Sequence, residues 1–248
     1  MVFRIVIPAR FDSSRLPGKA LLPLAGKPML QWVHERARKS RAAEVIIATD
    51  DERIATAARG FGAEVAMTAR SHVSGTDRIA EVATARGWAD DHIVINVQGD
   101  EPLIPPAIID QVAQLLASHA RADIATLAAR IDSAADFNDP NNVKVACDAA
   151  GRALYFSRAP IPCNRDAPTL LTAASLRHIG IYAYRVAALR RLAGLPASRL
   201  EQIEKLEQLR ALENAMEIRV ALAVERPLAD VNTAADLERA ERALTLGA

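Results

Sequence analysis

The chain has 248 residues, of which half are apolar and a quarter charged, with 31 basic and 30 acidic side chains. This composition excludes an intrinsically disordered chain and gives no basic footprint for nucleic acid. Two cysteines are too few for a disulfide scaffold, and no apolar run reaches the roughly 18 residues of a membrane span. Since the first residues do not resemble a signal peptide, we expect a cytoplasmic protein without membrane or nucleic-acid partners.

In the first half, short apolar runs alternate with segments whose apolar residues recur at helical spacing. The apolar runs predict strands at 3–7, 45–48, 64–67 and 92–97. The helical spacing predicts helices at 29–37, 52–59, 76–86 and 108–118. Buried strands between amphipathic helices indicate an α/β fold with a mostly parallel sheet covered on both faces.

The second half is richer in β-structure. Residues 143–156 predict a hairpin around the turn 148–151, and 177–184 a long strand. Residues 199–214 show the strongest helical pattern and predict a helix, with leucines and an isoleucine at every third position on its apolar side. A strand at 217–224 and a helix at 233–244 follow. With no linker in sight, we expect one α/β domain over 1–248 with a smaller β-rich lobe at about 130–190.

The loop that follows the first strand carries three cations, Arg10, Arg15 and Lys19, together with Ser13. In α/β folds, ligands bind at the carboxyl ends of strands, and cations with hydroxyl groups suit a polyphosphate. The loop matches neither the Walker A nor the GxGxxG pattern. A solvated basic loop is the alternative interpretation.

Two acids follow the strongest predicted strand. Asp100 is the best metal-ligand candidate, because Mg²⁺ prefers a carboxylate combined with substrate phosphates. The neighbouring Glu101 could instead cap the next helix, and both acids could be ordinary turn residues.

Two further groups are candidates for ligand contacts. Ser74 and Gly75 open a helix whose N-terminus suits an anion or a polar base edge, or they serve only as its cap. Arg158 and Arg177 could clamp a substrate carboxylate, for which the fork of arginine is well shaped. His178 alone is more typical of a hydrogen-bonded core histidine than of a catalyst.

Together these segments resemble the 3-deoxy-manno-octulosonate cytidylyltransferases, also called CMP-Kdo synthetases. The matching motifs are Pro-Ala-Arg-x-x-Ser-x-Arg-Leu-Pro-Gly-Lys at 8–19, Gly-Lys-Pro-Met at 26–29, Ala-Thr-Asp at 48–50, Ser-Gly-Thr-Asp-Arg at 74–78, Asn-Val-Gln-Gly-Asp-Glu-Pro at 96–102, Ala-Leu-Tyr-Phe-Ser-Arg at 153–158, Arg-His-Ile-Gly-Ile-Tyr at 177–182 and Leu-Glu-Gln-Leu-Arg at 206–210. The opening loop also suits CMP-sialic acid synthetases, whereas the segments at 153–158 and 177–182 are more specific.

The resemblance implies a nucleotide-diphospho-sugar transferase fold of the GT-A or Rossmann-like kind, in a homodimer whose β-rich lobe binds sugar and dimerises. It implies Mg²⁺-dependent transfer of CMP from CTP to 3-deoxy-D-manno-octulosonate (Kdo). The products would be pyrophosphate and CMP-Kdo, which feeds lipopolysaccharide core synthesis.

Site residues are carried over by position. The resemblance assigns nucleotide binding to Pro8, Ala9, Arg10, Ser13, Arg15, Lys19, Arg70, Ser74, Gly75 and Asp100, with Arg15, Lys19 and Asp100 catalytic. It assigns the sugar pocket to Gln98, Arg158, His178, Tyr182, Glu204, Glu207 and Gln208. For the last three, a solvated helix face is the alternative.

One departure from the family concerns the second metal ligand. Where the family has an acid near the C-terminus, this sequence has Asn232, and Asp230 lies two residues earlier. In an extended segment the two would share a face, so Asp230 could supply the carboxylate, or Asn232 could act as a weaker neutral ligand. The departure leaves open transfer to another acid sugar, such as an 8-amino Kdo analogue or a sialic-type acid, and a non-catalytic nucleotide-binding protein.

Overall fold

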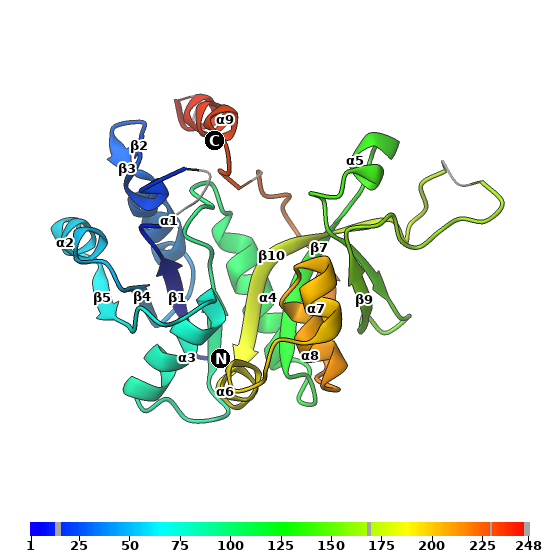
Figure 1. Ribbon diagram of the computed structural model, residues 1–248, viewed down its shortest axis with the longest axis horizontal. Helices are drawn as coiled ribbons and strands as arrows, with labels where there is room; N and C mark the ends of the chain where they lie inside the picture. Colours follow the sequence, from blue (N-terminus) through cyan, green and yellow to red (C-terminus); the bar gives the residue numbers. More distant parts are fainter. Residues whose placement is uncertain (13–15, 168–169, 229, 246–248) are drawn as a thin grey trace.

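The computed structural model describes residues 1–12, 16–167, 170–228 and 230–245. Its centre is a sheet in which seven strands lie in the order β11-β7-β10-β6-β1-β4-β5, with the hairpin β8–β9 attached to β10 (Figure 1). All neighbours in this row are parallel except that β10 runs antiparallel to β6 and β7. The predicted α/β fold with a mostly parallel sheet is therefore confirmed. None of the described helices has the length and apolar character needed to cross a bilayer.

The described elements have the following bounds. The strands are β1 Phe3–Ala9, β2 Pro23–Leu24, β3 Lys27–Pro28, β4 Glu44–Thr49, β5 Glu64–Met67, β6 Ile93–Asn96, β7 Ile124–Arg130, β8 Lys144–Cys147, β9 Ala153–Ser157, β10 Leu176–Arg185 and β11 Ile218–Leu222. The helices are η1 Lys19–Leu21, α1 Met29–Arg38, α2 Glu52–Gly60, α3 Gly75–Ala85, α4 Pro106–Ala117, α5 Ala134–Asn138, α6 Val186–Ala193, α7 Arg199–Glu204, α8 Gln208–Glu213 and α9 Ala234–Thr245.

The central strand β1 is apolar from Ile5 to Ala9 because both of its faces are covered there. Ile5 and Ile7 belong to one core, which includes residues of α1 and α4. Val6 points to the opposite face and belongs to a second core, with residues of α3, α6 and α8. Burial of such a side chain contributes about 1.5–3 kcal/mol, so the two cores hold the sheet rigidly between layers of helices.

The carboxyl ends of β1 and β6 meet at one edge of the sheet, where the loops that follow them touch. A Cβ on Gly99, just after β6, would lie 3.0 Å from the Pro8 carbonyl oxygen. A Cβ on Gly75, at the start of α3, would lie 3.1 Å from Pro8 Cγ. Glycine at these two positions lets the three segments pack against one another and form a single polar surface.

The predicted hairpin at 143–156 is confirmed, since β8 and β9 pair antiparallel. Its first residue, Lys144, is completely buried. The Lys144 ammonium donates to the carbonyl oxygens of Asp139, Asn142 and Arg158, at 2.9, 2.5 and 2.6 Å. This one side chain therefore ties the loop before the hairpin to the residue that follows it.

The prediction of one helix over 199–214 is wrong. The chain forms two short helices, α7 and α8, and Lys205 between them has a left-handed backbone with φ of 56°. Apolar residues at every third position drift by about 60° per step around an α-helix, so a continuous helix could not turn all of them toward the core. Leu206 and Leu209 are buried after the break, whereas Ile203 before it is 67% exposed.

We expect Lys144→Met to destabilise the protein by about 2–4 kcal/mol, because it leaves buried carbonyl oxygens without a donor. Urea unfolding followed by far-UV circular dichroism measures the change. The matched control is Lys39→Met, since Lys39 is exposed at the end of α1; its effect should stay within about 0.5 kcal/mol. Equal stability of the two variants would contradict the role of Lys144.

Candidate active site

Lys19 and Asp100 are joined by an ion pair at the carboxyl edge of the sheet. The Lys19 ammonium lies 2.6 Å from Asp100 Oδ2 and also donates to Asn232 Oδ1 at 3.1 Å. Lys19 follows β1 and Asp100 follows β6, while Asn232 precedes α9. The structure thus brings together three predicted site residues that are far apart in the sequence.

The segment before α9 brings a second acid to Asp100. The backbone N–H of Val231 donates to the Asp100 carbonyl oxygen at 3.0 Å, and Asn232 Nδ2 donates to Asp230 Oδ2 at 3.3 Å. Desolvation of the Asp230 carboxyl, and then the negative charge of Asp100, raise its pKa. Two carboxylates held against mutual repulsion form a site that favours a cation.

Glu101 adds a third carboxyl to this edge of the sheet. Its side chain is buried, and its Oε2 has no hydrogen-bond partner among the described residues. Burial, followed by the charges of Asp230 and Asp100, raises the pKa of Glu101 well above its usual value. The described residues nevertheless contain no cluster of three His, Cys, Asp or Glu side chains with the geometry of a metal cage.

The residues fit Mg²⁺ in the way that this ion is held beside phosphates. Mg²⁺ takes one or two carboxylates from the protein and completes its octahedron with water and substrate oxygens. Asp100 and Asp230 would supply the carboxylates, and Asn232, whose Oδ1 accepts from Lys19 and whose Nδ2 donates to Asp230, would supply a neutral oxygen. With Asn at position 232, Asp100 and Asp230 thus remain as the two carboxylates that could hold the ion.

A cavity of about 380 Å³, here called the small cavity, lies beside this cluster. It is lined by Arg10, Val73, Ser74, Gly75, Thr76, Asn96, Gln98, Ile124, Tyr182, Tyr184, Leu192, Glu207 and Gln208. Arg10 Nη2 donates to the Val73 carbonyl oxygen at 2.6 Å and so links the loop after β1 to the segment before α3. Predicted nucleotide residues and predicted sugar residues thus share one cavity.

Two residues in the wall of the small cavity have buried polar atoms without a hydrogen-bond partner among the described residues. Asn96 Oδ1 and Gln208 Nε2 are buried and have no hydrogen-bond partner among the described residues. Thr76 contacts both Tyr184 and Glu207, and desolvation raises the pKa of Glu207. Because unpaired buried groups are costly, one free acceptor and one free donor indicate a ligand with both kinds of polar group.

A second cavity of about 780 Å³, here called the large cavity, lies beyond the first. It is lined by Glu101, Asp136, Asp139, Asn141, Asn142, Val143, Arg158, Arg177, His178, Ile179, Gly180, Pro227, Leu228, Asp230, Asn232, Thr233, Asp236 and Arg239. The rings of His178 in the large cavity and Tyr182 in the small one have centroids 5.2 Å apart. The two cavities therefore adjoin across this ring pair, and Asp230 of the candidate metal site lines the large one.

His178 is held in one tautomer by Thr126, a buried residue of β7. The Thr126 hydroxyl lies 2.7 Å from the Ile181 carbonyl oxygen, to which it donates, and 2.9 Å from His178 Nε2. Its single hydrogen is used by the carbonyl, so we assign the proton of the ring to Nε2, which donates to Thr126. Burial of the ring, and then the charge of Arg177, lower the His178 pKa to about 3. The ring is neutral at physiological pH, with Nδ1 as an acceptor.

Glu204 holds Arg158 in place. Its carboxylate accepts from Ser157 Oγ at 2.6 Å and from the Arg158 backbone N–H at 2.9 Å, and its carbonyl oxygen accepts from Arg158 Nε at 2.7 Å. Glu204 lines neither cavity. Its contact with a sugar stays a prediction. The structure shows that Glu204 connects α7 to the end of β9 by hydrogen bonds.

The remaining predicted nucleotide residues have mixed placements. Pro8 and Ala9 form the end of β1 beside Gly99. Arg70 is exposed and lines neither cavity. Ser13 and Arg15 lie outside the described residues, so their roles stay predictions.

Asn96 and Tyr184 line the small cavity, although neither is among the predicted site residues. A signal was present for both. Asn96 is a polar residue at the end of an otherwise apolar strand, and Tyr184 lies two residues after Tyr182, on the same face of β10. The structure places both side chains where the sequence pattern alone only showed a buried strand.

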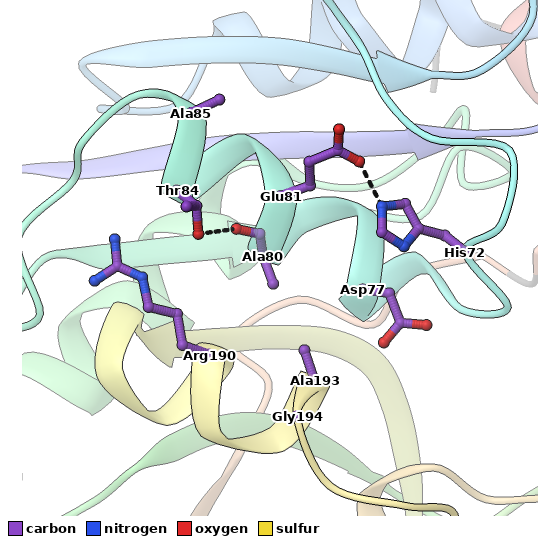
Figure 2. A pocket seen from close by; sticks show the side chains of 9 residues that line it. All are labelled: His72, Asp77, Ala80, Glu81, Thr84, Ala85, Arg190, Ala193 and Gly194. Carbon is purple, nitrogen blue, oxygen red and sulfur yellow. Dashed lines mark hydrogen bonds and ion pairs between the residues drawn. The ribbon is translucent and has the colours of Figure 1, made fainter.

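A shallow hollow of about 580 Å³ lies between α3 and α6 (Figure 2). Glu81 Oε2 lies 2.5 Å from His72 Nε2, and it also accepts from the Ala69 backbone N–H at 2.9 Å. These contacts fasten the segment before α3, which carries Ser74, to the body of that helix.

Comparison with known proteins gives full-length matches. A family model described as cytidylyltransferase matches residues 4–218. The 3-deoxy-manno-octulosonate cytidylyltransferase of Pseudomonas syringae pv. tomato is 56% identical over 98% of each chain, and that of Cellvibrio japonicus 54% identical over 100% of each. A solved structure of CMP:2-keto-3-deoxy-manno-octonic acid synthetase complexed with CTP is 43% identical over 100% of both chains, with a TM-score of 0.92.

We expect His178→Gln to remove a pH-dependent part of the stability. The pKa of His178 falls from 6.5 to about 3 on folding, so the neutral ring stabilises the protein above pH 6.5, and this contribution is lost as the pH falls toward 3. Between pH 7 and pH 5, the wild type should lose up to about 2 kcal/mol more than the variant, as measured by urea unfolding at both pH values. Parallel pH dependences of the two proteins would contradict the lowered pKa.

Proposed function

This chain belongs to the cytidylyltransferase family, and we propose that it transfers CMP from CTP to Kdo, releasing pyrophosphate. The observation that carries the proposal is the 0.92 TM-score, at 43% identity over both whole chains, to a synthetase of this sugar nucleotide complexed with CTP. The pair of adjoining cavities supports it, because the reaction needs a nucleotide and an acid sugar side by side. The product CMP-Kdo would serve lipopolysaccharide core synthesis.

The reaction is an in-line attack of the sugar's C2 hydroxyl on the α-phosphorus of CTP. Negative charge builds on the phosphorus oxygens and on the departing pyrophosphate. We infer that Lys19, held at the ends of β1 and β6 by Asp100, stabilises this charge once the phosphates arrive. Arg10 is anchored to the segment before α3 and would fix the position of the nucleotide.

We further propose that the enzyme depends on Mg²⁺, held by Asp100 and Asp230 with the Asn232 amide oxygen as a neutral ligand. When bound, Mg²⁺ would offset the charge of the phosphate oxygens and lower the pKa of a hydroxyl near it. The chain's part is to hold the acids together: the Val231 N–H on the Asp100 carbonyl oxygen and the Asn232 amide on Asp230 do so. The ion pair of Lys19 with Asp100 would then open in favour of phosphate.

We also infer that the protein is cytoplasmic, because CTP is available in the cytoplasm. Cys147 and Cys163 are both free thiols, which is expected in a reducing compartment. We also propose a homodimer, as the family resemblance implies. Light scattering of the purified protein would test the dimer.

The function is tested by following pyrophosphate release from CTP and Kdo in the presence of Mg²⁺. We expect rapid release that requires all three components and fails when ATP replaces CTP. Release only with an 8-amino Kdo analogue or a sialic acid would reassign the sugar substrate. Binding of CTP without release for any sugar acid would contradict an enzymatic function.

The proposed metal site predicts that two substitutions, Asp230→Asn and Asn232→Asp, change the Mg²⁺ requirement of the reaction in opposite directions. Asp230→Asn should raise the Mg²⁺ concentration for half-maximal rate by about tenfold or more, because it removes a charged ligand. Asn232→Asp should lower that concentration, because it adds a carboxylate beside Asp100. Magnesium titrations of the initial rate measure both. Identical titration curves for wild type and Asp230→Asn would show that Asp230 is not a ligand.

A further inference from the structure

Three of the described arginines line the large cavity, and two of them already bind other groups of the protein. Arg158 donates from Nε to the Glu204 carbonyl oxygen at 2.7 Å and from Nη1 to the Pro140 carbonyl oxygen at 2.9 Å. Arg239 forms an ion pair with Asp236 in the first turn of α9. Both guanidinium groups thus have fixed structural partners.

Arg177 is the exception. Within the part of the chain that the structure describes, its guanidinium forms no ion pair, and its Nε is buried without a hydrogen-bond acceptor. Arg177 lies near the start of β10, where its Cα is paired with Lys144 of β8 and Ala129 of β7. A buried donor on a charged group costs more when unpaired than a neutral one, so an acceptor from outside the chain is expected here.

Three of the acids that line the large cavity have partners of their own, whereas Glu101 Oε2 has no hydrogen-bond partner among the described residues. Asp136 Oδ2 accepts from Ser133 Oγ at 2.8 Å, and Asp139 Oδ1 accepts from the Asn141 N–H at 2.8 Å. Asp236 Oδ2 accepts from the Thr233 N–H, also at 2.8 Å. Among the described arginines that line the large cavity, Arg177 is therefore the one that a negatively charged ligand would find without a protein partner.

We propose that Arg177 binds the carboxylate of the acid sugar and thereby sets the enzyme's preference for acid sugars. This inference rests on the proposed function. A carboxylate offers two oxygens to the planar fork of a guanidinium. In Kdo the carboxylate and the attacking hydroxyl are both bonded to C2, so an anchored carboxylate also limits where the nucleophile can point. The neighbouring His178 is neutral and does not compete for the anion.

The test compares Kdo with its C1 amide in wild type and in Arg177→Met. We expect Arg177→Met to lower kcat/KM for Kdo by about 30-fold, the effect of losing a charge-assisted pair, with the KM for CTP unchanged. Replacing the carboxylate by the amide should cost the wild type a similar factor and cost Arg177→Met almost nothing. This loss of the amide penalty shows that residue and carboxylate interact.

Arg239→Met is the matched control, because Arg239 lines the same cavity but is exposed and paired with Asp236. Its kcat/KM for Kdo should change by less than about threefold. If Arg177→Met does not fold, as judged by its thermal unfolding, Arg177→Lys replaces it. That variant keeps the charge without the fork and should show a smaller loss and a partial amide penalty.

Two results would overturn the proposal: an unchanged kcat/KM for Kdo in the Arg177 variant, or a full amide penalty that persists in it. A wild-type protein that turns over CTP with no sugar acid would instead contradict the proposed function. The two failures are distinguishable because the first requires an active wild type.

Discussion

The direction of one strand decides where the two cavities form. β10 runs against its neighbours β6 and β7, so its first residues arrive at the edge where those strands end (Figure 1). Tyr182 of β10 pairs with Asn96 at the end of β6, and Arg177 and His178 extend farther along the same edge. A parallel strand in this place would have put these side chains at the opposite edge, away from the loops after β1 and β6. The antiparallel β10 therefore joins the candidate sugar residues to the candidate nucleotide residues.

The charged side chains at this edge lie in pairs, and a substrate or an ion can take the place of one partner in a pair. Lys19 neutralises Asp100, while Asp230 and the buried Glu101 remain close to one another and have raised pKa values. Such a site resists further negative charge unless cations enter with it. If an anionic nucleotide and a divalent cation arrive together, the nucleotide can pair with Lys19 and the cation with the acids. This agrees with the proposed role of Mg²⁺.

Much of this fold follows from the sequence, because β-branched runs such as 3–7 and 92–97 leave little choice but a buried strand. Asp100 and Lys19 were also predictable, since both follow such strands. The break at Lys205 was not, because leucines at every third position imitate a helical stripe although their period differs from 3.6. Nor could the sequence divide the candidate sugar residues between two cavities, since that division depends on the antiparallel β10 and on the ring contact of His178 with Tyr182.

The turn at Lys205 has a consequence for how related enzymes can diverge. Glu204 ends α7 and fastens β9, whereas Glu207 and Gln208 follow the turn and face the small cavity. Because the two helices are separate units, residues can be inserted or lost at the turn without unwinding either one. Such a change would alter the distance between Glu204, which binds Ser157 of β9, and the polar wall of the small cavity, while the sheet and the loops after β1 and β6 stay in place. Substrate preference can thus evolve at the turn between α7 and α8, independently of Lys19 and Asp100.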